Sequence, residues 1–475
     1  MKSYRISVII VFVLFRFLFS QTGYEKHFTG DALRIDYFHS GTKDEEKICI
    51  NQLYRVTPWA GSRENLIDTL NAGYYMVRVI DGNTNNLIYS YGFSTLFNEW
   101  QTTQEALQGV WKTIHETVLI PYPKHEIQLE FWSRDKKSHF SRLIFNTRID
   151  PRSYSINKEN RASGAIKLDS IINGDYSRKV DLVVIGEGFT STELTEFLNI
   201  AKALTDTMFT IEPFKDYSQE FNIYFVIRPS QDSGTDDPRK GIFSKTALNT
   251  SFNTFDSQRY LMTFDTKSIH DIASIVPYDA IIIIVNSETY GGGGIYNFYA
   301  STSAFNEWSP YVYVHEFGHS FAGLADEYYT SDVAYSEFYP PGIEPWETNV
   351  TPLLDPKNVK WANQIDQGIP IPTPWDKEKF DKANMEYRKK LRLLTDEKAP
   401  ASEIAKLSEN HQKWLDEFFM KSRYVGKTGA FEGAGYASEG LYRPAVNCIM
   451  FSKGLPGFDV VCKSTIERRI QFLIK

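Results

Sequence analysis

The first part of the chain alternates between hydrophobic and polar positions in short runs, as antiparallel strands with one buried face do. Turn-forming residues such as Asp81, Gly82 and Asn83 separate these runs. The pattern predicts strands at Leu33–Tyr37, Tyr74–Val79, Leu87–Gly92, Thr117–Ile120, Ile127–Trp132 and Ser141–Thr147. Residues 21–150 are therefore predicted to form an N-terminal β-sandwich domain.

The pattern changes after a polar stretch at 151–164, which we interpret as a linker. Beyond it, Val180–Ile185, Phe221–Ile227 and Asp279–Val285 are nearly continuous apolar runs, which are typical of strands covered on both faces. A helix is predicted between the first two runs, so residues 165–475 have the order of an α/β or α+β domain.

Residues 375–423 are charged and amphipathic with helical spacing. They predict a helical hairpin that is inserted into the second domain. A short helix is also expected at the C-terminal end, at Ser464–Leu473.

Composition narrows the possible partners and the location. The net charge is −7 and no basic run occurs, which argues against a nucleic-acid partner. Residues 1–20 resemble a signal peptide, with Lys2 and Arg5 before an apolar segment that Arg16 interrupts. The segment is too short for a stable membrane anchor, so we expect a secreted or periplasmic protein.

The chain has three cysteines, and an exported protein can keep a disulfide. Cys448 and Cys462 are close in sequence and form the expected pair, which leaves Cys49 over.

The strongest chemical signal is His315-Glu316-x-x-His319, in a helix predicted to begin near Pro310. Residues four apart on a helix share a face, so both imidazoles can bind one Zn²⁺ while Glu316 stands beside a water molecule. The alternative is a buried histidine pair with only a structural role.

A catalytic zinc site usually has three protein ligands. The helix can end at Gly323 and the chain can turn back, which makes Asp326 our predicted third ligand and Glu327 its rival. Much later, Met450 lies in a tight segment, and a methionine beneath the zinc histidines is typical of metzincins.

Two further stretches could serve the reaction. Tyr442 or Arg443, close in sequence to Met450, could stabilise the oxyanion, or they could only pack the floor of the site. Gly292, Gly293 and Gly294 could form a flexible turn, or an edge strand that binds a peptide backbone.

Several separate stretches carry a family resemblance, among them VVIGEGFT at 183–190, YGGGGIYN at 290–297, HEFGHSFAGLADEY at 315–328 and GLYRP at 440–444. With them, the chain resembles the immunoglobulin A peptidase family of bacterial zinc metallopeptidases. The resemblance implies a metzincin-like peptidase domain with a mixed sheet and an active-site helix, preceded by a β-sandwich. It also implies zinc at His315, His319 and Asp326, catalysis by Glu316 and a Met-turn at Met450. The chain departs from the general metzincin spacing, because glycine and the third ligand come one residue late, at Gly323 and Asp326.

These observations predict a secreted zinc endopeptidase that cleaves extracellular or host proteins through a metal-activated water. One alternative is a hydrolase of cell-wall peptides. Another is a binding or adhesion protein on a peptidase-like scaffold, although a pure binding protein has no need of Glu316. The substrate does not follow from the family resemblance.

Overall fold

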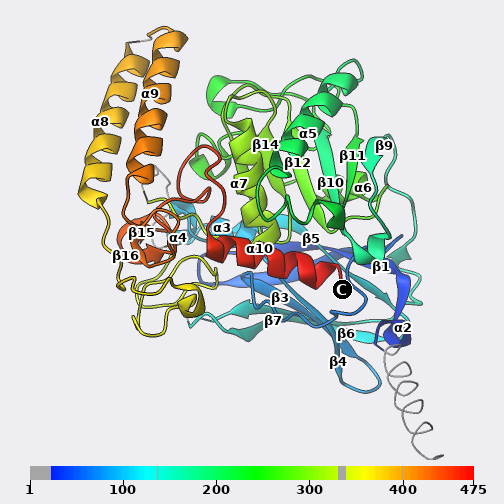
Figure 1. Cartoon of the computed structure of the whole chain (residues 1–475). Helices are drawn as coiled ribbons and strands as arrows, with labels where there is room; N and C mark the ends of the chain where they lie inside the picture. The colour runs from blue at the N-terminus through cyan, green and yellow to red at the C-terminus, as the bar shows by residue number, and fades with distance from the viewer. Residues whose placement is uncertain (1–22, 136, 330–337, 398) are drawn as a thin grey trace, which may run out of the picture.

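The alternating runs of the N-terminal part form two four-stranded sheets, which lie at the bottom of Figure 1. The computed structural model describes residues 23–135, 137–329, 338–397 and 399–475, so the expected signal peptide lies outside the described residues. After helix α2 (Tyr24–His27), the first sheet has the order β5-β1-β2-β8 and the second the order β4-β3-β6-β7. Their strands are β1 (Phe28–Gly41), β2 (Glu46–Val56), β3 (Tyr75–Asp81), β4 (Leu87–Phe93), β5 (Lys112–Pro123), β6 (Ile127–Arg134), β7 (Phe140–Ile149) and β8 (Ile156–Asn157).

The two sheets enclose one hydrophobic core. Ile35 and Tyr37 of β1 are buried in a cluster with Val77 of β3 and Phe131 of β6, and the rings of Tyr37 and Phe131 lie 5.0 Å apart. The runs predicted as strands lie in β1 and β3–β7. The segment expected as a linker contributes β8, which pairs with β2.

The apolar runs of the second part form a six-stranded sheet of order β13-β14-β12-β10-β11-β9. Its strands are β9 (Ile166–Ile171), β10 (Val180–Glu187), β11 (Phe221–Ile227), β12 (Ala280–Val285), β13 (Gly292–Gly294) and β14 (Ala300–Ser303). The four inner strands are parallel and the two edge strands are antiparallel to their neighbours. The predicted mixed α/β arrangement is confirmed.

Both faces of this sheet are covered. Val184 faces helices α5 (Leu194–Met208) and α7 (Ser309–Ala322), whereas Val183 faces helix α6 (Thr266–Ala273). Phe97, in the short helix α3 (Leu96–Trp100) of the N-terminal part, is buried in the same cluster as Val183. Helix α4 (Gln104–Leu107) follows α3. The N-terminal part therefore completes the core beneath the six-stranded sheet.

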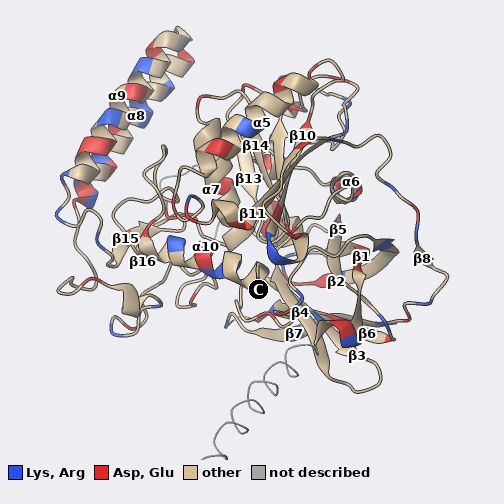
Figure 2. Ribbon diagram, turned by 45° about the vertical axis from the view of Figure 1, so that its right-hand side comes forward, with Lys and Arg blue, Asp and Glu red and all other residues tan. Residues whose placement is uncertain are grey.

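The predicted helical hairpin consists of α8 (Lys377–Asp396) and α9 (Ala401–Met420), which project from the body of the molecule (Figure 1). Residues of both charge signs occur along the two helices, whereas the ribbon of the central sheet is mostly tan (Figure 2). Buried Phe380 and Phe419 join the base of the hairpin to the core. No helix in the described part of the chain is long and apolar enough to cross a membrane.

The C-terminal part returns to the centre of the molecule. The hairpin of β15 (Phe431–Ala434) and β16 (Ala437–Arg443) precedes helix α10 (Val460–Leu473). This last helix begins earlier than predicted because the side chain of Asp459 caps the backbone N–H groups of Val461 and Cys462.

Candidate active site

Helix α7 holds the two histidines at the edge of the six-stranded sheet. Pro310 occupies its first turn, and the helix ends at Gly323, whose φ of 67° lies in the left-handed region. His315 and His319 lie on one face, with their Nε2 atoms 3.1 Å apart. The predicted spacing of the motif thus brings both imidazoles to one point.

The loop after Gly323 brings Asp326 back to the histidines. Its Oδ1 lies 3.0 Å from Nε2 of His315 and 3.2 Å from Nε2 of His319. The side chain of Asn349 accepts a hydrogen bond from the N–H of Ala325 and donates one to its C=O, which fixes the backbone of the residue just before Asp326. Glu327 is engaged elsewhere: its Oε1 accepts from Asn349 at 2.9 Å and lies 3.3 Å from the sulfur of Cys462.

The opposite nitrogen of each imidazole is bound to the backbone. Nδ1 of His315 lies 3.0 Å from the carbonyl oxygen of Ile449, and Nδ1 of His319 lies 2.6 Å from that of Leu324. These contacts make Nδ1 the donor and turn the Nε2 lone pairs toward Asp326. The hydroxyl of Tyr436 donates to the other oxygen of Asp326.

Met450 lies directly beneath α7 and is fully buried. A Cβ added to Gly318 would stand 3.1 Å from its sulfur, so the absence of a side chain at residue 318 permits this close packing. The predicted methionine is therefore placed below the histidines, beside the residue whose carbonyl orients His315.

Charges interact strongly around these residues. Burial favours a raised pKa for Asp326, but the charge of His319 and the hydrogen bonds from both histidines hold it well below its ordinary value. Burial lowers the pKa of His319, but the charge of Asp326 outweighs it and raises this pKa to about 9. Burial raises the pKa of Glu316.

Glu316 and the histidines line a cavity of about 110 Å³. Its walls come from both parts of the chain, and they include residues that the sequence did not indicate. These are Tyr74, Glu99, Arg259, Tyr290, Tyr328, Tyr339 and Tyr436. Tyr290 and Tyr328 lie within stretches that carry the family resemblance, but the sequence assigned them no role, and only the folded chain shows that all seven side chains meet at one cavity.

Tyr442 lies apart from this cavity. Its hydroxyl is 3.5 Å from Glu432, and its ring packs on a separate cluster with Trp361. Arg443 is buried and donates to the carbonyl oxygen of Gly433 at 2.6 Å. The tyrosine of this hairpin that faces the cavity is Tyr436.

The glycine row forms the edge strand β13. Gly292 and Gly294 line the cavity, and a Cβ at Gly294 would stand 2.3 Å from the backbone oxygen of Glu316. The N–H of Gly292 already donates to the carbonyl of Arg259 at 3.2 Å, and its C=O accepts from Leu261 at 3.3 Å. The ring of Tyr260 and the sulfur of Met262 occupy the space beside Gly293.

The three cysteines are free. Cys448 and Cys462 are adjacent, as their spacing suggested, but their sulfurs are 4.0 Å apart and no bond joins them. Cys49 is exposed on β2.

The donor atoms of His315, His319 and Asp326 fit a divalent metal ion. Two imidazole nitrogens and one carboxylate oxygen are the ligand types of catalytic zinc sites, and here the three atoms lie 3.0–3.2 Å from one another. Glu316 stands in the same group, with a carboxylate oxygen within 4.8 Å of the imidazole nitrogens.

Comparison with known families agrees with this geometry. Residues 168–470 match the family model described as IgA Peptidase M64, and residues 23–145 match the one described as Peptidase M64 N-terminus. No match to the chain is found among curated proteins. Because the first match alone covers more than half of the 475 residues, this chain belongs to the IgA peptidase M64 family and is a metallopeptidase.

Proposed function

We propose that the chain is an exported, zinc-dependent endopeptidase that cleaves extracellular or host proteins. The observation that carries the proposal is the meeting of His315, His319 and Asp326 at one point, with Glu316 beside them in a cavity. The signal-like composition of residues 1–20 supports export.

His315, His319 and Asp326 would hold the zinc ion. When bound, zinc would polarise the scissile carbonyl and make a water molecule more acidic. Glu316 would accept a proton from the attacking water and pass it to the leaving amine. Its burial supports this role, because a carboxyl with a raised pKa can return the proton.

Arg259 would help to stabilise the negative charge that develops on the carbonyl oxygen. It is the one arginine or lysine among the described residues that line the cavity, and the hydroxyl of Tyr328 accepts a hydrogen bond from it at 2.7 Å. This contact would hold the guanidinium in place before the reaction begins.

The substrate would bind as an extended strand beside β13. The backbone of Gly292 is already engaged, but strand alternation points the N–H and C=O of Gly294 to the same outer edge. Recognition through the main chain requires no free chain end, which supports cleavage within a polypeptide.

Glu316→Gln tests the proposal. The variant keeps the size of the side chain but cannot accept the proton, so hydrolysis of an unfolded protein substrate should fall by about 10²–10⁴-fold. The zinc content should not change. Glu307→Gln, in an exposed turn before α7, is the matched control and should leave both quantities unchanged. A Glu316→Gln enzyme with normal turnover, or a zinc-loaded wild type that cleaves no peptide bond, would contradict the proposal.

A further inference from the structure

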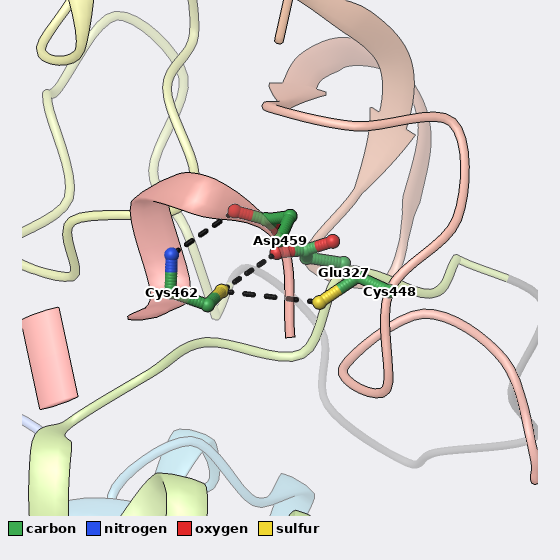
Figure 3. Close-up of side chains that lie close together, drawn as sticks. All are labelled: Glu327, Cys448, Asp459 and Cys462. Atoms are coloured by element: carbon green, nitrogen blue, oxygen red, sulfur yellow. Dashed lines mark hydrogen bonds between the residues drawn. The ribbon is translucent and has the colours of Figure 1, made fainter. Parts of the chain in front are cut away.

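Four side chains converge behind the active-site loop and are not used by the proposed reaction: Glu327, Cys448, Asp459 and Cys462 (Figure 3). They come from the loop after α7, the Met450 segment and the start of α10. One potential ligand atom of each lies within 4.8 Å of those of the others. The two sulfurs are 4.0 Å apart, and the sulfur of Cys462 is 3.3 Å from Oε1 of Glu327.

Each carboxylate in this cluster has one anchored oxygen and one free oxygen. Oε1 of Glu327 accepts from Asn349 at 2.9 Å, and Oδ1 of Asp459 accepts the two N–H groups that it caps. The second oxygens, Oε2 and Oδ2, are buried and have no hydrogen-bond partner among the described residues. Glu327 is fully buried. Buried carboxylates close to each other are unfavourable unless a cation or a proton lies between them.

We propose that Glu327, Cys448, Asp459 and Cys462 bind a second divalent metal ion of the zinc type. A tetrahedral zinc site has Zn–S distances of about 2.3 Å and Zn–O distances of about 2.0–2.2 Å, which places neighbouring donors roughly 3–4 Å apart. The measured separations of 3.3 and 4.0 Å lie in this range. Four protein ligands leave no open position, so the site is structural.

The second ion would tie together the parts that shape the active site. Glu327 follows Asp326 directly, and its N–H donates to the carbonyl of Met450 at 2.8 Å. Cys448 precedes the carbonyl of Ile449 that orients His315. The ion would therefore hold two segments against the start of α10: the loop that carries Asp326, and the Met450 segment beneath α7.

Metal analysis of the purified, reduced full-length chain tests this proposal without any measurement of activity. Wild type should hold two zinc ions per chain, the Cys448→Ser/Cys462→Ser double variant one, and the Cys49→Ser control two. The His315→Ala/His319→Ala variant should also hold one ion, because it loses the ion of the first site and keeps that of the second.

Cobalt substitution gives a second readout on the wild-type chain, which matters if the double cysteine variant fails to fold. Thiolate-bound Co²⁺ absorbs by charge transfer in the near ultraviolet, and the site of His315, His319 and Asp326 has no thiolate. The band should appear in wild type and in His315→Ala/His319→Ala. One ion per chain without this band would overturn the proposal. The proposal would also be overturned if the protein purified without reductant contained a Cys448–Cys462 disulfide, seen as the loss of two hydrogens in its mass, and bound a single ion.

Discussion

Tyr436 is expected to control how tightly the first metal ion is held. Its hydroxyl donates to the oxygen of Asp326 that faces away from the histidines, and so it sets the direction of the other oxygen. Loss of such a supporting hydrogen bond typically weakens metal affinity by about 10–100-fold. Tyr436→Phe should therefore raise by that factor the free zinc concentration that half-activates the enzyme, measured in metal-buffered assays.

Tyr442→Phe is the matched control for this substitution. Its hydroxyl faces Glu432, away from the cavity, so the zinc concentration for half-activation should not change. If Tyr442→Phe shifted the zinc requirement and Tyr436→Phe did not, our assignment of the two tyrosines would be reversed.

The sequence predicted the meeting of His315 and His319 because helical periodicity alone puts them on one face. It could not decide between Asp326 and Glu327. That choice depends on the left-handed residue Gly323 and on Asn349, which together set which side of the extended loop faces α7. Glu99 and Arg259 were missed because they reach the cavity only through tertiary packing.

At the scale of elements, two neighbouring parallel strands begin beside a pair of close carboxylates. The N–H of Asp181 in β10 donates to the carboxylate of Asp279, just before β12, at 2.9 Å. Burial raises the pKa of both groups, and the charge of Asp279 raises that of Asp181 further. In the unfolded chain these carboxyls lose their protons as the pH rises past the ordinary Asp pKa of 3.8. In the folded protein they keep their protons to a higher pH.

Because the folded state binds more protons, its stability should fall as the pH rises from about 4 through neutrality. Asp181→Asn resembles the protonated form and retains an acceptor for Asn222 and Tyr224. The variant should gain about 1–3 kcal/mol relative to wild type at pH 8 and much less at pH 5, as measured by urea unfolding. Asp206→Asn, on the exposed face of α5, should show no such pH-dependent difference. An equal effect of Asp181→Asn at both pH values would refute this account.

Elements with a regular pattern were predicted well, and the exceptions have physical reasons. The inner strands β10, β11 and β12 are buried on both faces, which produces apolar runs that need no tertiary information. Helix α3 was not predicted, since it has only five residues and four of them are buried, so no polar face reveals its period. Strand β2 was missed because its burial does not alternate regularly.

At the scale of the whole molecule, the two parts that match separate family models are built as one body. Leu96 and Phe97 of the N-terminal part share a buried cluster with Ile269 and Ile272 of α6. The same part supplies Tyr74 and Glu99 to the cavity. Local sequence patterns describe each part but not their contact, which is why this shared core and shared site could not be predicted.

An ion-pair network at this contact should couple the folding of the two parts. Arg34 of β1 is only 2% exposed and donates to Asp36 on its own strand at 2.7 and 2.8 Å, and to Asp271 of α6 at 2.6 Å. Arg34→Ala leaves Asp36 buried without its cation and leaves Asp271 paired only with Arg161, at 3.2 Å, so it should cost about 3–5 kcal/mol of unfolding free energy. Arg55 forms a surface ion pair with Asp31, and its side chain is 40% exposed. Arg55→Ala should therefore cost less than about 1 kcal/mol of unfolding free energy.

A double-mutant cycle separates this coupling from local damage to β1. If the contact joins the two parts, Arg34→Ala and Asp271→Ala should interact by about 0.5–3 kcal/mol, and calorimetry of the wild type should show a single transition. Arg34→Ala should also change the active site at a distance, because β1 pairs with β5 and helix α3, which carries Glu99, packs on β5. Additive substitutions together with two separate thermal transitions would show that the parts fold independently, and the shared core would then have no role in stability.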